Sequence, residues 1–233
     1  MASEDQPTDL RQRVRQLVTD ALEQDDPCRW FEPLYREAQG DVDQVPWAGR
    51  APHRLLQEWL SQQPTLDGVA IVIGCGLGDD AEALQQHGLQ VTAFDISPTA
   101  IAWCRQRFPD SEVDYQVADL LALPDDWQHR FDLVFECRNI QALPLSLRNR
   151  AIAAVASLVA PHGTLLVVTH LRDQHEVEPD GPPWPLSEKE LAGFETLGLV
   201  EGDRQLHQEM ASPVRQVRVE YRQGIPSPIH DAE

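Results

Sequence analysis

The chain has 233 residues, of which 42% are hydrophobic and 24% are charged, which is enough for one sizeable α/β core. Its 38 acidic and 19 basic side chains give a net charge of −19, so neither nucleic-acid backbones nor anionic membranes are expected partners. No apolar run is long enough to span a membrane and the N-terminus lacks a signal-peptide layout, so we expect a cytoplasmic protein.

Residues 9–24 repeat apolar side chains at helical spacing, which predicts an amphipathic helix. The following segment, residues 28–52, concentrates aromatic side chains, among them Trp30 and Trp47. We expect residues 1–63, which end in a further helix, to form an N-terminal extension whose aromatic segment closes over the ligand-binding edge as a lid. In the alternative interpretation, these rings only cover the apolar edge of the sheet domain.

The run VAIVI at residues 69–73 is apolar and rich in β-branched residues, which predicts a strand buried on both faces. The glycine loop GCGLG follows, then a helix over residues 79–87 and a second strand that ends at Asp95. Glycines at such a turn allow a ligand to approach the backbone, and a carboxylate at the next strand tip can accept hydrogen bonds from ribose hydroxyls. Alternatively, the glycines only permit a tight turn and Asp95 caps the following helix.

The spacing of the glycines distinguishes two classes of nucleoside cofactor. A dinucleotide-binding loop has glycines at its first, third and sixth positions. Here Gly74, Gly76 and Gly78 occupy the first, third and fifth positions, and Asp79 occupies the sixth. A carboxylate there would face the pyrophosphate of a dinucleotide, so the loop favours a nucleoside that carries an amino acid. A dehydrogenase that binds nicotinamide dinucleotides is the rival interpretation.

The rest of the chain alternates predicted strands and helices. These are a helix at 98–108, strands at 112–117 and 131–135, a helix at 147–159, a strand at 164–169, a helix at 188–197 and a hairpin of 199–210 with 214–222. The proline-rich residues 170–186 predict a loop over the site, and residues 224–233 predict a frayed tail. Four scattered cysteines without a C-x-x-C pair indicate free thiols and no metal site.

Taken in this order, the motifs of residues 69–222 resemble the class I S-adenosylmethionine-dependent methyltransferases. The resemblance implies a Rossmann-like, doubly wound, seven-stranded and mostly parallel sheet with an antiparallel last strand, in a core of residues 64–223. It also implies S-adenosyl-L-methionine as cofactor, with Asp119 accepting the adenine amino group; otherwise Asp119 only caps a short helix. The residues expected to bind the cofactor are Trp30, Gly74, Cys75, Gly76, Gly78, Asp79, Asp95, Ile96, Asp119, Leu120 and Glu136.

A narrower pattern of tryptophans and prolines is similar to the thiopurine S-methyltransferase-like group. It consists of Trp30, Tyr35, Val45-Pro46-Trp47, Pro52, Leu143-Pro144 and the residues from Gly181 to Pro185. That group methylates small molecules, often soft nucleophiles such as thiols, selenium or tellurium species and halides. We therefore expect a small-molecule acceptor and a monomer or weak homodimer. The residues expected to bind the acceptor are Trp47, Cys137, Asn139 and Trp184.

The sulfonium of the cofactor already activates the methyl group, so catalysis consists mostly of in-line positioning. A hydroxyl or amine acceptor needs a neighbouring base, for which Glu136 and His170 are the candidates, whereas a thiolate needs none. Glu136 can equally orient the cofactor, and a lone histidine is often structural. Two alternatives remain open: an O- or N-methyltransferase of a small metabolite, and a non-catalytic, cofactor-binding regulatory protein.

One departure from the family pattern concerns the end of the first strand. Many relatives carry an acidic residue just before the glycines, whereas this strand ends in Val72-Ile73. Asp79 or a residue of the N-terminal segment would then have to hold the amino end of the cofactor.

Overall fold

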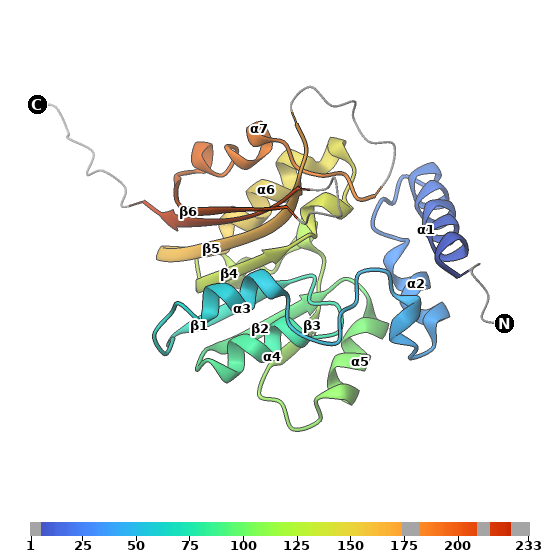
Figure 1. The fold of residues 1–233 in the computed structure, drawn as a ribbon, viewed down its shortest axis with the longest axis horizontal. Helices are drawn as coiled ribbons and strands as arrows, with labels where there is room; N and C mark the ends of the chain where they lie inside the picture. The colour runs from blue at the N-terminus through green and yellow to red at the C-terminus, as the bar shows by residue number, and fades with distance from the viewer. Residues whose placement is uncertain (1–5, 174–181, 209–214, 225–233) are drawn as a thin grey trace, which may run out of the picture.

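The computed structural model describes residues 6–173, 182–208 and 215–224. They form a single sheet with helices on both faces (Figure 1). The strands are β1 (Val69–Ile73), β2 (Gln90–Asp95), β3 (Asp114–Val117), β4 (Phe131–Cys137), β5 (Val159–Leu171), β6 (Leu199–Gln208) and β7 (Arg215–Gln223). The helices are α1 (Gln6–Glu23), α2 (Phe31–Ala38), α3 (Arg54–Leu60), α4 (Asp79–Gln86), α5 (Pro98–Arg107), α6 (Arg148–Ser157) and α7 (Glu188–Leu191). Short 3-10 turns are η1 (Val42–Gln44), η2 (Leu120–Ala122), η3 (Asp125–Trp127), η4 (Ile140–Ala142), η5 (Leu145–Leu147) and η6 (Glu195–Leu197).

The sheet has seven strands in the order β3-β2-β1-β4-β5-β7-β6. β7 runs antiparallel to both of its neighbours, and the other strand pairs are parallel. This confirms the predicted Rossmann-like fold with an antiparallel last strand. Because β1 pairs with β2 on one side and with β4 on the other, the strand order reverses at β1, and sheets of this kind bind ligands at the carboxyl edge of that point.

Successive side chains of the buried strands enter two separate cores. Ile71 and Ile73 of β1 pack in the core on the side of α6 and α7, whereas Ala70 and Val72 pack with α3, α4 and α5. All four side chains are at most 2% exposed, and burying an isoleucine of this kind contributes roughly 1.5 to 3 kcal/mol. None of the described helices is both long and apolar enough to cross a membrane.

The N-terminal helices are attached to the sheet domain at the carboxyl end of β2. Glu32 of α2 accepts hydrogen bonds from Ser97 Oγ (2.6 Å), Thr99 Oγ1 (2.7 Å) and Thr99 N (3.2 Å) at the N-terminus of α5. Burial alone would raise the pKa of Glu32, but these hydrogen bonds lower it below its ordinary value. Figure 1 shows α1 and α2 beside this end of the sheet. The division of the chain at residue 63 stays a prediction.

The sequence does not predict α2, because residues 28–52 show a concentration of aromatic side chains without a clear helical periodicity. The helix buries Leu34, Tyr35 and Ala38 on one side. This apolar pattern covers little more than one helical turn, which is too short to be distinguished among the surrounding aromatic residues.

The strand β5 begins at Val159, earlier than predicted. Its register with β4 shifts, because Phe131 pairs with Val159 whereas Leu133 pairs with Thr164. Residues 160–163, interpreted from the sequence as a turn before the strand, are therefore an irregularity inside it.

The predicted helix over residues 188–197 is divided. α7 ends at Leu191 and η6 is a separate turn, with Gly193 between them. Glycine is a poor helix former, which explains the interruption. The predicted hairpin of β6 and β7 is confirmed, although its turn at 209–214, the loop residues 174–181 and the tail from 225 lie outside the described residues.

We expect Glu32→Ala to lower the free energy of unfolding by about 1 to 3 kcal/mol, because it leaves the donors at the start of α5 without their charged acceptor. Urea unfolding measures this change, and limited proteolysis reports whether the N-terminal segment has detached. Glu37→Ala is the matched control, since Glu37 lies on the same helix in an exposed ion pair with Arg13. Equal effects of the two substitutions would contradict the attachment through Glu32.

Candidate active site

The glycine loop joins β1 to α4 at the carboxyl edge of the sheet. Gly74, Gly76 and Gly78 have φ values of +52°, +56° and +90°, which other residues rarely adopt. A Cβ at Gly74 would lie 1.8 Å from Asn139 Oδ1, and a Cβ at Gly78 would lie 2.5 Å from the Tyr115 hydroxyl. The loop therefore needs glycine both for its backbone conformation and for the side chains packed on it.

Asp95 closes this loop onto the end of β2. Its carboxylate accepts hydrogen bonds from Gly76 N (3.0 Å) and Ser97 N (2.9 Å), one on each oxygen. Burial raises the pKa of Asp95 to about 6, although the backbone N–H groups of Ser97, Gly76 and Ile96 oppose the rise. Each oxygen keeps a lone pair, so the loop contact leaves Asp95 able to accept from a ligand hydroxyl.

Asp119 lies at the end of β3, one strand further out. Its Oδ1 accepts a hydrogen bond from Leu121 N (2.8 Å) and so caps the turn η2, which is the alternative role considered for it. Leu120 is buried beside it in the core. The structure thus places Asp119 and Leu120 at the expected strand tip, and the adenine contact stays a prediction.

The two aspartates that open α4 point to different partners. Asp79 forms a two-pronged ion pair with Arg107 of α5, with N–O distances of 2.8 and 2.9 Å. Asp80 accepts only one hydrogen bond among the described residues, from His53 N (2.6 Å), and burial raises its pKa to about 6. Asp79 is thus paired on both oxygens, whereas Asp80 keeps one oxygen without a hydrogen-bond partner among the described residues, and the cofactor contact of Asp79 stays a prediction.

Glu136 is completely buried near the end of β4 and pairs in register with Ile73, next to the glycine loop. Its Oε1 accepts hydrogen bonds from Asn139 N (2.6 Å) and Ile140 N (3.0 Å), while Oε2 has no partner. Burial raises its pKa to about 7, although these hydrogen bonds and the charge of Arg148 oppose the rise. Its bonds fix the loop that follows β4, and its roles as a base or a cofactor ligand stay predictions.

The loop after β4 folds back over the first glycine. Asn139 Nδ2 donates to Ile73 O (2.7 Å) and to Cys137 O (3.1 Å), which holds its side chain against Gly74. Burial raises the pKa of the Cys137 thiol well above its usual value, so the thiol stays protonated and is no nucleophile. Both residues thus lie beside the first glycine of the loop, and their contact with the acceptor stays a prediction.

His170, the second candidate base, is held by Gln141. Gln141 Oε1 accepts hydrogen bonds from His170 N (2.7 Å) and Thr169 Oγ1 (2.9 Å). These two donors orient the Gln141 amide, so that its Nε2 lies 3.2 Å from His170 Nδ1 and donates to it. Nδ1 is therefore an acceptor and the ring proton sits on Nε2. Burial and Arg138 lower the pKa of His170 to about 4, which leaves a neutral ring whose free nitrogen donates.

The aromatic segment lies over the glycine loop. Trp47 Nε1 donates to the Tyr35 hydroxyl (2.9 Å), and that hydroxyl lies 3.3 Å from the position of a Cβ at Gly76. Trp30 is buried, packs edge-to-face on Trp47 (5.5 Å between centroids), and shares a cluster with Trp184 of the proline-rich loop. The two predicted lid segments therefore meet each other beside the site.

Sequence reasoning missed several side chains at this edge, including His53, Asp80, Arg138 and Gln141. The one available signal was the position of Arg138 and Gln141 just after a strand, since strand exits meet at the ligand edge. Nothing in the sequence placed His53 against α4. Within the described parts of the chain, no group of His, Cys, Asp and Glu side chains is arranged to hold a metal ion.

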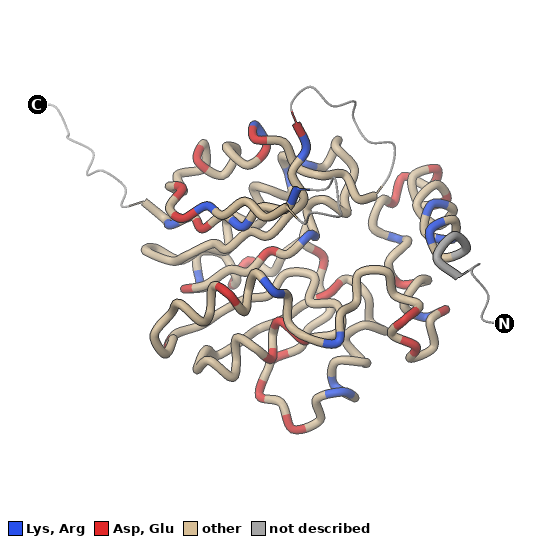
Figure 2. Tube along the Cα trace, in the orientation of Figure 1, with Lys and Arg blue, Asp and Glu red and all other residues tan. Residues whose placement is uncertain are grey.

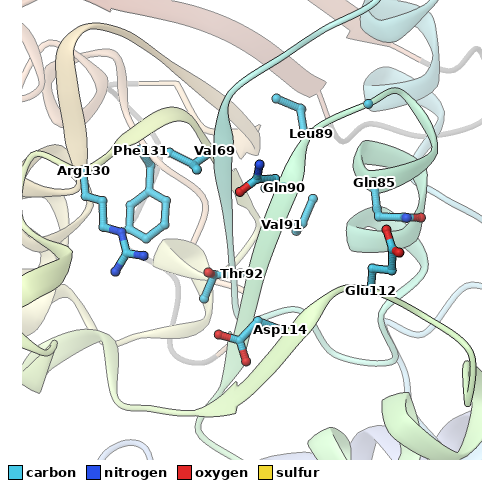
Figure 3. Close-up of a pocket in the computed structure, with 11 residues that line it drawn as sticks. Val69, Gln85, Leu89, Gln90, Val91, Thr92, Glu112, Asp114, Arg130 and Phe131 are labelled. Atoms are coloured by element: carbon cyan, nitrogen blue, oxygen red, sulfur yellow. The ribbon is translucent and has the colours of Figure 1, made fainter.

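A hollow of about 410 Å³ lies at the opposite, amino edge of the sheet (Figure 3). The first residues of four strands line it, namely Val69, Gln90, Asp114 and Phe131. It is separate from the glycine loop and belongs to the edge where ligands of such sheets do not bind.

Residues 70–163 match the family model described as a methyltransferase domain. This part of the chain, from β1 into β5, is similar to a methyltransferase domain. The strand order confirms the predicted class I fold, and the similarity supports S-adenosylmethionine as the cofactor. The narrower resemblance to the thiopurine group stays a prediction.

Curated relatives are ubiquinone biosynthesis O-methyltransferases. The chain is 31% identical to that of Xanthomonas campestris pv. campestris (strain B100) over 144 residues, which is 60% of this chain and 56% of the relative. It is 32% identical to that of Coxiella burnetii (strain RSA 493 / Nine Mile phase I) over 115 residues, which is 48% of each chain. The chain thus spans about half the length of the relatives it matches.

Solved structures share the fold at lower identity. The N-methyltransferase NodS from Bradyrhizobium japonicum WM9, in complex with S-adenosyl-l-homocysteine, has a TM-score of 0.58 and 21% identity over 91% of this chain and 98% of its own. The [4+2]-cyclase SpnF has a TM-score of 0.66 and 17% identity over 86% of this chain and 96% of its own. Since these two proteins are named for different reactions, the fold alone does not fix the chemistry.

The raised pKa of Glu136 predicts a pH-dependent stability. The folded chain binds this proton up to about pH 7 and the unfolded chain only up to about 4.5, so the free energy of unfolding falls as pH rises between these values. Glu136→Gln keeps the acceptor oxygen for the loop and removes the charge. We expect the variant to lose less stability than the wild type between pH 5 and 8, by on the order of 3 kcal/mol. Urea unfolding across this range measures it, and parallel pH profiles would contradict the assignment.

Proposed function

We propose that the chain is an S-adenosylmethionine-dependent methyltransferase that acts on a small-molecule acceptor. The observation that carries the proposal is the glycine loop closed onto Asp95 at the point where the strand order reverses. The match to a methyltransferase domain supports the same conclusion, and the net charge of −19 disfavours nucleic acid as acceptor.

The residues at this edge fit the groups of the cofactor. The glycine loop admits a ligand close to its backbone, Asp95 offers lone pairs to the ribose hydroxyls, and Asp119 stands at the next strand tip for the adenine amino group. The cofactor, when bound, supplies a methyl group activated by a sulfonium. Tyr35 lies against the loop at Gly76, and Trp47 and Trp30 pack beside it, where aromatic faces favour a cation and exclude water.

Asp80 takes the place of the acidic residue that the first strand lacks. Its Oδ2 has no hydrogen-bond partner among the described residues, and its carboxylate lies close enough to Cys137 to raise the pKa of that thiol. It therefore sits between the glycine loop and the end of β4, where the amino-acid portion of the cofactor belongs. We assign Asp80 to the ammonium group of the cofactor.

Asp95→Ala should weaken the binding of S-adenosyl-L-homocysteine by about 30-fold or more, because a buried pair of charge-assisted hydrogen bonds is lost. Titration calorimetry measures the dissociation constant. Asp114→Ala, which removes an exposed carboxylate at the start of β3, serves as control and should leave the affinity unchanged. An unchanged affinity of a folded Asp95→Ala protein would overturn the ribose assignment.

Asp80→Asn retains the acceptor oxygen for His53 N and removes the charge. We expect this substitution to lower the affinity for the cofactor at pH 7.5 by about 10-fold, because one charge-assisted hydrogen bond is lost. Asp79→Asn distinguishes the two aspartates. The Asp79 carboxylate is already paired with Arg107, so this substitution should change the affinity for the cofactor less than about threefold. If Asp79→Asn has the larger effect, the sequence-based choice of Asp79 is the right one.

Two acceptor classes have separate support. The curated relatives favour a hydroxyl, since their names describe O-methylation. The two candidate bases favour a thiol or other soft nucleophile. His170 offers no free acceptor nitrogen and Glu136 is buried, so an acceptor that ionises without a base suits the site better. A screen of small phenols, thiols, selenite, tellurite and halides with labelled cofactor separates these classes. Cofactor binding without any methyl transfer would support a regulatory protein instead.

A further inference from the structure

A row of polar side chains crosses the sheet beyond the end of β4. His170 of β5 pairs in register with Gln216 of β7, and Gln216 pairs with His207 of β6. Paired residues of neighbouring strands point to the same face, so the three side chains lie side by side. Arg138, which follows β4, joins this row because its Nη2 donates to Gln216 Oε1 at 3.0 Å.

Arg138 is held in an uncommon backbone conformation. Its φ is +65°, and its N–H donates to Val168 O at 2.9 Å, which fixes the direction of the side chain across β5. The Nε atom is buried and has no hydrogen-bond partner. A buried guanidinium N–H is costly without an acceptor, so Nε is available to an oxygen of a ligand.

The two histidines nearest to Arg138 are hydrogen-bond donors. His53 Nδ1 accepts from Leu55 N (3.2 Å), just as His170 Nδ1 accepts from Gln141. Both rings must therefore carry their proton on Nε2. Burial, followed by the positive charge of Arg138, lowers the pKa of His53 to about 4, so this ring is also neutral. The row thus presents N–H groups and no free acceptor on these rings.

Further buried nitrogen atoms without a hydrogen-bond partner lie along the same face of β6 and β7. His207 Nε2 is buried without a partner. Arg218, two residues after Gln216, is completely buried, and only its Nη2 is bonded, to Asp203 at 2.6 Å, while Nε and Nη1 have no partner. Figure 2 shows basic positions here although acidic positions dominate the chain. Asp80 is the nearby carboxylate, and the described residues contain no ion pair between Asp80 and Arg138.

We propose that the acceptor of this methyltransferase carries an anionic group, best a carboxylate, which binds Arg138 and the Nε2–H groups of His53 and His170. The inference rests on the proposed methyl transfer for the identity of the ligand, and it names the substrate class of that site. A carboxylate supplies an acceptor for Arg138 and fits a planar guanidinium with two oxygens.

The carboxylate of the cofactor itself is the competing occupant. Arg138 lies near enough to Asp80 for its positive charge to oppose the rise in the pKa of that carboxyl, so the proposed cofactor and acceptor sites are neighbours. The head of Arg138 nevertheless points away from the glycine loop, because its Nη2 reaches Gln216 of β7, beyond β5. This direction favours the acceptor, which approaches from the side of β4 and β5.

The test compares acceptors that differ only in charge. The probes are 3,4-dihydroxybenzoate against 3,4-dihydroxybenzamide, and 2-mercaptobenzoate against 2-mercaptobenzamide. We measure methyl transfer from labelled cofactor, and the affinity of each probe by calorimetry on the protein with and without S-adenosyl-L-homocysteine. The wild type should favour the acids through a lower KM or Kd, and Arg138→Gln should remove that preference with a loss of about 10- to 100-fold for the acids alone.

Two further variants control the result. Arg138→Lys should restore part of the preference, because it keeps the charge without the planar fork. Arg50→Gln removes an exposed arginine that pairs with Asp43 on the N-terminal segment and should leave the preference intact. Circular dichroism establishes that each variant is folded.

The outcomes separate this inference from the proposed function. Equal affinity of acids and amides in the wild type overturns the inference, as does an equal loss for both in Arg138→Gln. A weaker affinity of Arg138→Gln for S-adenosyl-L-homocysteine assigns Arg138 to the cofactor and also overturns it. If the protein binds no cofactor, the proposed methyltransferase function is wrong. Calorimetry with the acid and amide probes then still tests whether Arg138 forms an anion site.

Discussion

The contact between Asp95 and the glycine loop is the constraint on which the site depends. One carboxylate bridges the loop after β1 and the start of α5, so the tips of two neighbouring strands are held at a fixed separation. The same end of α5 binds Glu32, which attaches the N-terminal helices. Asp95 at the tip of β2 thereby fixes the glycine loop. Through the start of α5, Asp95 is also connected with the N-terminal helices.

Charges are separated along the carboxyl edge. Carboxylates lie on the side of β1, β2 and α4, whereas Arg138 and the His170 ring lie toward β5 and β7, and His53 stands beside Asp80 where the two groups meet. This arrangement suits a cationic cofactor beside an anionic acceptor. It also leaves little general-base capacity, because Glu136 is occupied with the loop after β4 and His170 presents a proton rather than a lone pair.

Covering segments from distant parts of the chain meet at this edge. The cluster of Trp30 with Leu17 and Leu34 includes Trp184, whose N–H donates to Gln141 O at 2.7 Å. Gln141 in turn orients His170, so the packing of the N-terminal segment is connected to the polar row by direct contacts. A change in how these helices pack would therefore reach the acceptor side as well as the glycine loop.

The sequence by itself determined the order of the seven strands, the glycine loop and the strand-tip positions of Asp95 and Asp119, because hydrophobic periodicity and glycine spacing are local properties. It also indicated the antiparallel last strand through a family resemblance. It did not determine the choice between Asp79 and Asp80, since adjacent residues on a helix differ by about 100° and only the position of Arg107 and His53 decides which carboxylate is paired. The donor character of His170 likewise depends on Gln141, and the row from Arg138 to His207 depends on strand register. Such properties arise from contacts between residues far apart in the chain, which only the tertiary structure brings together.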